Sequence, residues 1–312
     1  MNHRDSLSSF HPTVAFFYFA VVLVLSMFLT HPLCLGISLG SALAYNLVLH
    51  GKKAVGKQLF FLFPMASLAI LVNAAFSHAG TTVLTYLPSG NVLTLESILY
   101  GCAAAAMLST AILWFSCFHA VMTADKLMYL FGKGIPSLSL ALSMTLRFVP
   151  RFQEQLHRIS DAQRCVNRGT EHGSFLQKTK NAVSMLSVLI TWALENAMET
   201  ADSMKSRGYG LPGRTAFSLY RFDSRDKAVL CWLLAGGFCI FSGWASGSFI
   251  WRYYPSIKGA GLTPQAVCAY LFYLFFCLTP TALELSERAR WKKLRGVGTS
   301  SGQGGDSHGK QL

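Results

Sequence analysis

The chain has 312 residues, of which 52% are hydrophobic and 13% are charged, and its formal net charge is +13. This composition excludes an ordinary soluble domain and is typical of membrane proteins. The basic residues gather in a few segments between long apolar runs, which is the pattern of a positive-inside membrane protein and argues against nucleic acid as a partner.

Six apolar stretches are long enough to cross a bilayer, since a span needs about 20 helical residues. They are residues 13–30, 33–50, 58–77, 95–119, 227–249 and 265–283. We therefore predict an all-α, polytopic membrane protein with about six transmembrane helices and a helical cytoplasmic region between the fourth and fifth spans. The first stretch shows no small-residue cleavage site and is expected to be a retained helix.

The loops between the first four spans predict the orientation. The segment 51–57, GKKAVGK, carries three lysines, whereas the segment after the third span, SHAGTTVLTYLPSGNV, has neither Lys nor Arg. The positive-inside rule puts the first of these in the cytoplasm and the second outside. Both termini are then cytoplasmic, although the outer loop 251–259 carries Arg252 and Lys258 against the rule.

The chain divides by composition into four parts. These are a four-span region (1–122), a block with mixed charge (123–226), two further spans (227–285) and a basic and then glycine-rich tail expected to be disordered (286–312). The block 123–226 holds 14 of the 27 basic and 9 of the 14 acidic residues. Its apolar segments, 135–150 and 181–198, have cations at both ends and are expected to lie at the interface or to pack on each other, not to span.

Two helices in this block are expected to end in the same way. Pro136 can open a helix, Pro150 marks a boundary or a kink, and the following helical pattern stops at Gly169. A second pattern runs from about residue 175 to Gly208, with Glu195, Glu199, Ser203 and Arg207 spaced by four. Both ends share A-x-x-x-x-x-R-G, from Ala162 to Gly169 and from Ala201 to Gly208. Glycine suits the position after a helix and arginine suits its last turn, so a pair of well-capped helices is the plain alternative to two similar docking ends.

These features resemble the transmembrane T component of energy-coupling factor transporters, the family that includes the Q subunit of cobalt and nickel importers. The resemblance covers most of the chain and is most specific over Leu142 to Arg151, which ends in RFVPR, and over the two Arg-Gly ends. The family usually has Ala before the Arg, where this chain has Asn167 and Ser206.

The resemblance implies an energy-coupling subunit of an ABC importer. In the family each Arg motif ends a cytoplasmic coupling helix and docks in a groove of one of two ATP-binding cassette ATPase subunits. The implied docking residues are Asn167, Arg168, Gly169, Ser206, Arg207 and Gly208. The implied partners also include a substrate-binding membrane S component, in the plasma (inner) membrane of a bacterium or archaeon, for uptake of a vitamin or of cobalt or nickel ions.

No catalytic, cofactor or metal site is expected in this chain. The segment GKKAVGKQ (51–58) matches G-x-x-x-x-G-K, but Gln58 stands where a phosphate-binding loop needs Ser or Thr, and the segment joins two spans instead of following a strand. ATP hydrolysis is therefore expected in partner subunits. Cys117 and His119 point to different faces of a helix, and no C-x-x-C pair occurs.

Two questions remain open from the residues alone. The pairs Gly36/Gly40 and Gly243/Gly247 have G-x-x-x-G spacing, which favours packing inside this chain over contact with a partner. Asn46 and Asn73 lie within spans and are candidates for hydrogen bonds between helices.

A stand-alone secondary transporter is the alternative function, which the near absence of acidic residues in the spans disfavours. No converging polar set in the spans suggests an intramembrane enzyme.

Overall fold

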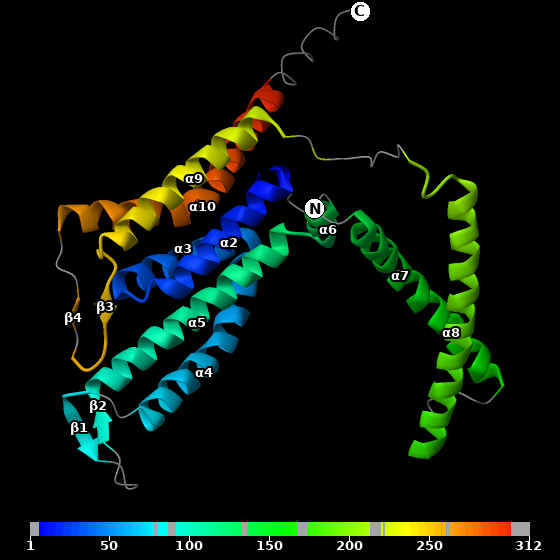
Figure 1. Ribbon diagram of the computed structural model, residues 1–312, viewed down its shortest axis with the longest axis horizontal. Coiled ribbons are helices and arrows are strands. Elements are labelled where there is room, and N and C mark those ends of the chain that lie inside the picture. The colour runs from blue at the N-terminus through cyan, green and yellow to red at the C-terminus, as the bar shows by residue number, and fades with distance from the viewer. Residues whose placement is uncertain are drawn as a thin grey trace, which may run out of the picture. The chain divides into compact units, whose positions relative to one another are not determined.

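A computed structural model describes residues 6–77, 80–86, 92–132, 136–166, 174–212, 220, 222–256, 258–259 and 263–300 (Figure 1). The chain forms two compact units. We call residues 1–123 and 220–312 the span unit, and residues 124–219 the middle unit. Each unit is treated by itself below.

The span unit confirms the all-α polytopic prediction. Its helices are α1 (Ser6–Ser9), α2 (Pro12–Phe28), α3 (Pro32–His50), α4 (Lys52–Phe76), α5 (Leu95–Val121), α9 (Ser224–Ala245) and α10 (Pro264–Ser300). Among the described residues, five of these helices are long and apolar enough to cross a membrane. The helix α2 is apolar but shorter, at 17 residues or about 26 Å.

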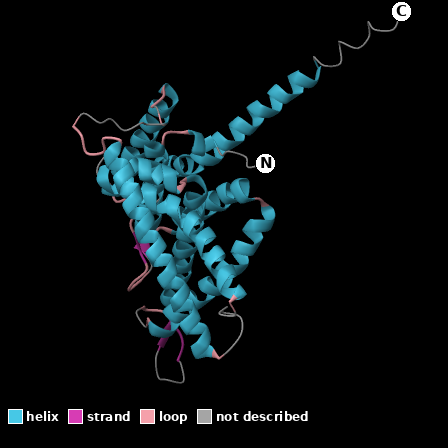
Figure 2. Cartoon of the chain, turned by 90° about the vertical axis from the view of Figure 1, so that its right-hand side faces the viewer, coloured by secondary structure: helices cyan, strands magenta, loops and turns pink. Residues whose placement is uncertain are grey.

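Two helix boundaries differ from the predicted spans. The helix α4 begins at Lys52, six residues before the predicted apolar stretch, and α10 continues to Ser300, well past residue 283. Both extensions are polar or basic, so hydropathy alone does not detect them, although Lys and Arg are good helix formers. The structure also adds two small hairpins that were not predicted, β1 (Val83–Tyr86) with β2 (Val92–Thr94) and β3 (Trp251–Arg252) with β4 (Lys258–Gly259) (Figure 2).

A cluster of aromatic rings forms the core of the span unit. Trp114 of α5 is fully buried and makes edge-to-face contacts with Tyr18 and Phe19 of α2, at ring-centroid distances of 6.1 and 6.3 Å. The Trp114 indole N–H donates to Ser38 Oγ of α3 at 3.2 Å, so the ring is oriented as well as packed. The Tyr18 hydroxyl donates to the Cys277 carbonyl oxygen of α10 at 3.2 Å. Four helices therefore meet at this cluster.

The helices α4 and α5 approach closely along a small-residue stripe that the sequence prediction missed. Ser97, Gly101 and Ala105 of α5 are all buried and recur every four residues. A Cβ on Gly101 would lie 3.3 Å from the Ile70 Cα, so glycine allows the two backbones to come together. The Ser97 hydroxyl donates to the Asn73 carbonyl oxygen at 3.1 Å across the same contact.

The two predicted G-x-x-x-G pairs have different outcomes. A Cβ on Gly243 would lie 2.9 Å from the Ala269 Cβ, so this glycine packs inside the chain as predicted. Gly247 has φ +79° and belongs to the turn after α9. The prediction was wrong for Gly36 and Gly40, because a Cβ on either would meet no described atom within 4 Å. Both glycines lie on an open face of α3. The close small-residue contact is instead the one that α5 makes with α4.

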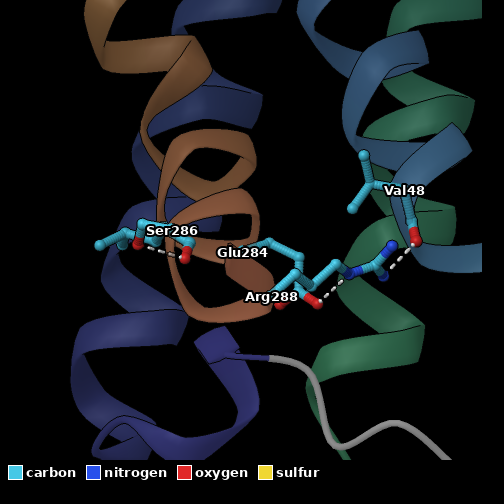
Figure 3. Close-up of polar contacts among 5 residues, drawn as sticks. Val48, Glu284, Ser286 and Arg288 are labelled. Atoms are coloured by element: carbon cyan, nitrogen blue, oxygen red, sulfur yellow. Dashed lines mark hydrogen bonds and ion pairs between the residues drawn. The ribbon is translucent and has the colours of Figure 1, made fainter. Parts of the chain in front are cut away.

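Polar contacts join helix ends at one end of the span unit. The His11 N–H, before α2, donates to the Asp226 carboxylate of α9 at 3.1 Å. Arg288 of α10 donates to the Val48 carbonyl oxygen of α3 at 2.7 Å and to the Glu284 carboxylate at 2.9 Å (Figure 3). The Asn46 amide donates to Gln58 of α4 at 2.8 Å, which confirms the predicted interhelix hydrogen bond for Asn46. The Asn73 side-chain oxygen, by contrast, has no hydrogen-bond partner among the residues that the structure describes.

The opposite end of the span unit carries both hairpins. The Tyr253 hydroxyl donates to the Thr30 carbonyl oxygen at 3.0 Å, and Tyr254 and Ser77 share a hydroxyl hydrogen bond of 2.9 Å. The Glu96 carboxylate, at the start of α5, accepts hydrogen bonds from the Thr82 hydroxyl at 2.6 Å and from its backbone N–H. Successive spans therefore begin and end at alternate ends, as six crossings require. Which end faces the cytoplasm stays a prediction.

The middle unit consists of α6 (Ala124–Gly132), α7 (Pro136–Cys165) and α8 (Phe175–Ser206) (Figure 1). The helix α7 begins at Pro136 as predicted. Of the two alternatives at Pro150, a boundary is wrong because the helix continues through it, and a kink stays a prediction. Neither α7 nor α8 qualifies as a span among the described helices, which agrees with the prediction that their apolar segments do not cross.

Candidate functional site

The tip of α8 contains three of the predicted docking residues. The helix has 32 residues, which corresponds to a rod of about 48 Å. Its last helical residue is Ser206, Arg207 is the C-cap with φ −84° and ψ 10°, and Gly208 follows with φ +77°. The predicted helix end at Gly208 is confirmed.

Backbone hydrogen bonds fix the geometry of this tip. The Gly208 N–H donates to the Lys205 carbonyl oxygen at 3.0 Å, and the Tyr209 N–H donates to the Met204 carbonyl oxygen at 3.0 Å. These two bonds form a Schellman motif, in which a left-handed residue satisfies the last carbonyl groups of a helix. Glycine is needed at position 208 because a Cβ is strained at this φ and would also meet the Leu211 Cδ1 at 3.1 Å. The chain therefore turns away directly behind Arg207.

Arg207 is exposed at this turn. Its side chain has no hydrogen bond or ion pair with the described part of the chain, so its guanidinium is available to another molecule. The Ser206 hydroxyl donates back to the Ser203 carbonyl oxygen at 2.9 Å and helps to close the last turn. Arginine offers five donors in a rigid fork and keeps its charge at any cellular pH, which suits it to carboxylate or carbonyl groups in a partner's groove.

Apolar side chains follow the arginine in the chain, and the sequence prediction missed them. Tyr209 and Leu211 follow the turn and are 43% and 66% exposed. Met204, which is half-buried, lies one turn before Gly208. An apolar residue directly after a C-terminal glycine often accompanies a Schellman motif, so the sequence Gly-Tyr-Gly-Leu did carry a signal. The tip thus combines two exposed cations, Lys205 and Arg207, with an apolar border.

The other three predicted docking residues, Asn167, Arg168 and Gly169, lie outside the described residues. The structure describes α7 to Cys165 and the chain to Val166. The similarity of the two helix ends therefore stays a prediction, and so does any role of Arg168.

The helices α7 and α8 pack along a single seam. Half-buried or buried residues recur every three or four positions on each helix: Met144, Phe148, Phe152, Gln155 and Ile159 on α7, and Met185, Leu189, Trp192, Asn196, Thr200 and Met204 on α8. The Phe152 and Trp192 rings make an edge-to-face contact with centroids 5.8 Å apart.

The remaining faces of α8 expose many large apolar side chains. Those at least 45% exposed are Phe175, Leu176, Val183, Leu186, Val188, Ile190, Leu194 and Met198. Charged residues such as Lys180, Glu195 and Glu199 are interspersed among them and are also exposed. An exposed apolar surface of this extent on a helix that does not qualify as a span marks an interaction surface.

The segment that matches a phosphate-binding loop is not such a loop. Gly51 has φ +79° and is the single residue between α3 and α4, and residues 52–58 are helical. A phosphate-binding loop instead wraps backbone N–H groups around the phosphates between a strand and a helix. The residues 51–58 therefore have no geometry for nucleotide phosphate, as the sequence analysis predicted.

Comparison with known proteins agrees with this architecture. The family model described as "Cobalt transport protein" (CbiQ) matches residues 3–217. Similar curated proteins carry the name "Energy-coupling factor transporter transmembrane protein EcfT". The one from Lacticaseibacillus paracasei is 34% identical over 110 residues, which is 35% of this chain and 40% of that protein. The one from Streptococcus thermophilus is 30% identical over 123 residues, covering 39% and 47%.

A third relative, from Clostridium kluyveri, is 37% identical over 105 residues, covering 32% of this chain and 39% of that protein. The aligned part thus spans less than half the length of these three relatives. The family model, in contrast, extends over more than two thirds of the chain, from the segment before α2 through the middle unit to residue 217. This chain therefore belongs to the CbiQ family of transmembrane transport proteins, which is the T-component family of energy-coupling factor transporters.

Proposed function

We propose that this chain couples ATP hydrolysis by two ABC-type ATPase subunits to a substrate-binding membrane subunit. The observation that carries the proposal is the exposed Arg207 at the tip of α8, with Gly208 turning the chain away behind it. Family membership agrees with a transport role, and the chain itself provides no phosphate-binding loop at residues 51–58.

Arg207 would anchor an ATPase subunit. A guanidinium at a helix tip can enter a groove and bind carboxylate or carbonyl oxygens there, while Tyr209 and Leu211 cover the rim. Truncating one partner of a buried, hydrogen-bonded charge pair typically costs about 2 to 5 kcal/mol of binding free energy. The predicted second anchor is Arg168, which would serve the second ATPase subunit.

The packing of α7 on α8 supports transmission of motion. A displacement of the α8 tip would pass along a helix of 32 residues that is held to α7 by the Phe152–Trp192 contact. Movement of the ATPase subunits during the ATP cycle would thereby shift both helices together. Rigid elements with few internal contacts are suited to this role.

The exposed apolar faces of α7 and α8 would form the platform for the substrate-binding membrane subunit. That subunit, and not this chain, would determine the substrate, which we propose to be a vitamin or a cobalt or nickel ion. The family's description as a cobalt transport protein favours the metal ion. We further propose that the Lys-bearing start of α4 and both termini face the cytoplasm, which labelling of a single-cysteine Lys52→Cys variant from each side would test.

Co-purification with the ATPase subunits tests the anchoring role. The chain is expressed with its cognate ATPase subunits, and we expect the double variant Arg168→Glu, Arg207→Glu to recover less than a tenth of the wild-type ATPase, because a carboxylate repels the groove's acceptors. A charge reversal at Arg158, which is exposed on α7, is the matched control and should recover the wild-type amount.

Recovery of stoichiometric ATPase by the double variant would contradict the proposal. The alternative function, a stand-alone secondary transporter, makes the opposite claim. It requires that the chain reconstituted alone moves substrate without ATP, and that charge reversal at Arg207 leaves this activity unchanged.

A further inference from the structure

The start of α4 has a fixed rotation about its axis. Val55 and Leu62 are buried, at 5% exposure each, and Gln58 between them accepts the 2.8 Å hydrogen bond from the Asn46 amide of α3. These three residues lie on one face of α4 and turn that face toward the bundle. The opposite face of the same turns must therefore point outward.

Two lysines and a phenylalanine share this outward face. Lys53, Lys57 and Phe60 stand at positions i, i+4 and i+7, which places them in one column along the helix. Both lysine side chains are exposed, and their ammonium groups have no hydrogen bond or ion pair with the described residues. Phe60 is 84% exposed, among the largest values for an apolar side chain in the span unit.

The column lies where α4 changes from basic to apolar residues. The helix α4 qualifies as a span, and its apolar segment begins at Leu59. Lys57 precedes Phe60 by three residues, or about 4.5 Å along the axis. The Phe60 ring therefore contacts acyl chains when the lysine ammonium groups lie at the depth of the headgroup phosphates.

Arg288 lies at the adjoining end of α3, where it donates to the Val48 carbonyl oxygen, and its side chain remains 36% exposed. The neighbouring carboxylate, Glu284, is 4% exposed and already engaged by Arg288 (Figure 3). No described carboxylate forms an ion pair with Lys53 or Lys57, so the pair keeps its attraction for an anion.

From this placement we propose that Lys53 and Lys57 bind the headgroup of an anionic phospholipid whose acyl chains lie over Phe60. The two ammonium groups would bind the phosphate, and the exposed apolar face beyond them would hold the chains. Basic residues beside a span attract anionic lipid with about 1 kcal/mol each. This inference is independent of the proposed transport function, because it concerns the span unit in the bilayer alone.

Native mass spectrometry of the purified full-length chain tests it. The protein is released from micelles that contain equal amounts of phosphatidylglycerol and phosphatidylcholine, and the bound lipids are counted. We expect the wild type to prefer phosphatidylglycerol, and the variant Lys53→Gln, Lys57→Gln to lose about 30-fold of that preference, which corresponds to two cations at about 1 kcal/mol each. Lys53→Arg, Lys57→Arg should keep the preference because it keeps both charges.

The matched control removes two exposed cations from a helix that does not qualify as a span, Arg147→Gln with Arg151→Gln on α7. It should keep the wild-type preference. An equal loss in both double variants would show that charge anywhere on the chain suffices and would overturn the site. Full retention by Lys53→Gln, Lys57→Gln, or a loss in the arginine variant, would overturn it as well.

Discussion

The span unit and the middle unit bury their residues in different ways. In the span unit, four helices enclose Trp114 and its aromatic neighbours with almost no exposure, and polar contacts join the helix ends. In the described part of the middle unit, the buried apolar residues are Met128, Ile159 and Met185, and the long helices meet along one seam. The span unit thus has a core of its own, whereas the middle unit has mainly surface.

Exposed apolar side chains consequently mean different things in the two units. Phe60 and its neighbours on α4 lie on a helix that qualifies as a span, where lipid is the natural solvent. Leu194 and Met198 lie on α8, which does not qualify and which carries exposed Glu195 and Glu199 beside them. Water would be an unfavourable environment for such a surface, so a partner protein is the expected cover. The difference supports the proposal that the middle unit binds partner subunits.

Truncating one tryptophan in each unit should give the largest contrast. Trp114→Ala removes a fully buried ring and leaves a cavity among α2, α3 and α5, so we expect a loss of about 3 to 5 kcal/mol in the free energy of unfolding. Trp192→Ala removes a half-buried ring and one edge contact with Phe152, with an expected loss of about 1 kcal/mol.

Hydrogen exchange of the chain in lipid nanodiscs measures both effects. Trp114→Ala should accelerate exchange in several spans together, and Trp192→Ala should accelerate it in α7 and α8 only. If both variants changed exchange by similar amounts and over the whole chain, the separation into two units would be wrong.

Local sequence patterns predicted the helices well. Apolar runs of this length must be helical in a bilayer, and Pro12, Pro32 and Pro136 each start a helix, because proline fits a first turn. The end of α8 at Gly208 was also predictable, since glycine and arginine have separate physical reasons to stand there. For the candidate site, the sequence therefore located the tip but not its apolar border.

Contacts between distant segments could not be predicted. His11 and Asp226 are 215 residues apart, and nothing in either neighbourhood names the other. The Arg288 contact with Val48 likewise depends on how α10 packs against α3. Ser97, Gly101 and Ala105 did carry a small-residue pattern, but a single sequence does not say which of several such stripes is covered.

Two similar ion pairs, one in each unit, should differ by an intermediate amount in their contribution to the free energy of unfolding. Glu284 with Arg288 and Glu154 with Arg158 are both i, i+4 pairs, with N–O distances of 2.9 and 2.6 Å. Arg288→Met would remove the cation paired with Glu284, whose side chain is 5% exposed, and the donor to the Val48 carbonyl oxygen. We expect this to cost about 1.5 to 3 kcal/mol. Arg158→Met breaks a pair whose side chains are 69% and 66% exposed, and should cost less than about 0.5 kcal/mol.

Thermal unfolding of both variants in the same detergent checks this pair of values. Salt offers a second readout, because it screens an exposed pair and affects a partly buried one less. A larger loss for Arg158→Met than for Arg288→Met would contradict the view that the span unit depends on its polar contacts.

Replacing one glycine by alanine in each unit should have the smallest effect on stability, with opposite signs in the two units. Gly208→Ala places a Cβ at φ +77° and within 3.1 Å of Leu211, so we expect it to destabilise the last turn of α8 by about 1 kcal/mol. Gly56→Ala lies in the helical interior of α4, where a Cβ meets nothing within 4 Å, and should stabilise that helix by about 0.5 to 1 kcal/mol. Amide exchange of residues 204–209 should become faster in the first variant, and that of residues 53–60 slower in the second. The Gly208→Ala change leaves Arg207 itself intact. Weaker ATPase recovery with this variant would therefore show that the turn, and not the charge alone, is needed for docking. Unchanged amide exchange at residues 204–209 would show that the glycine does not hold the tip.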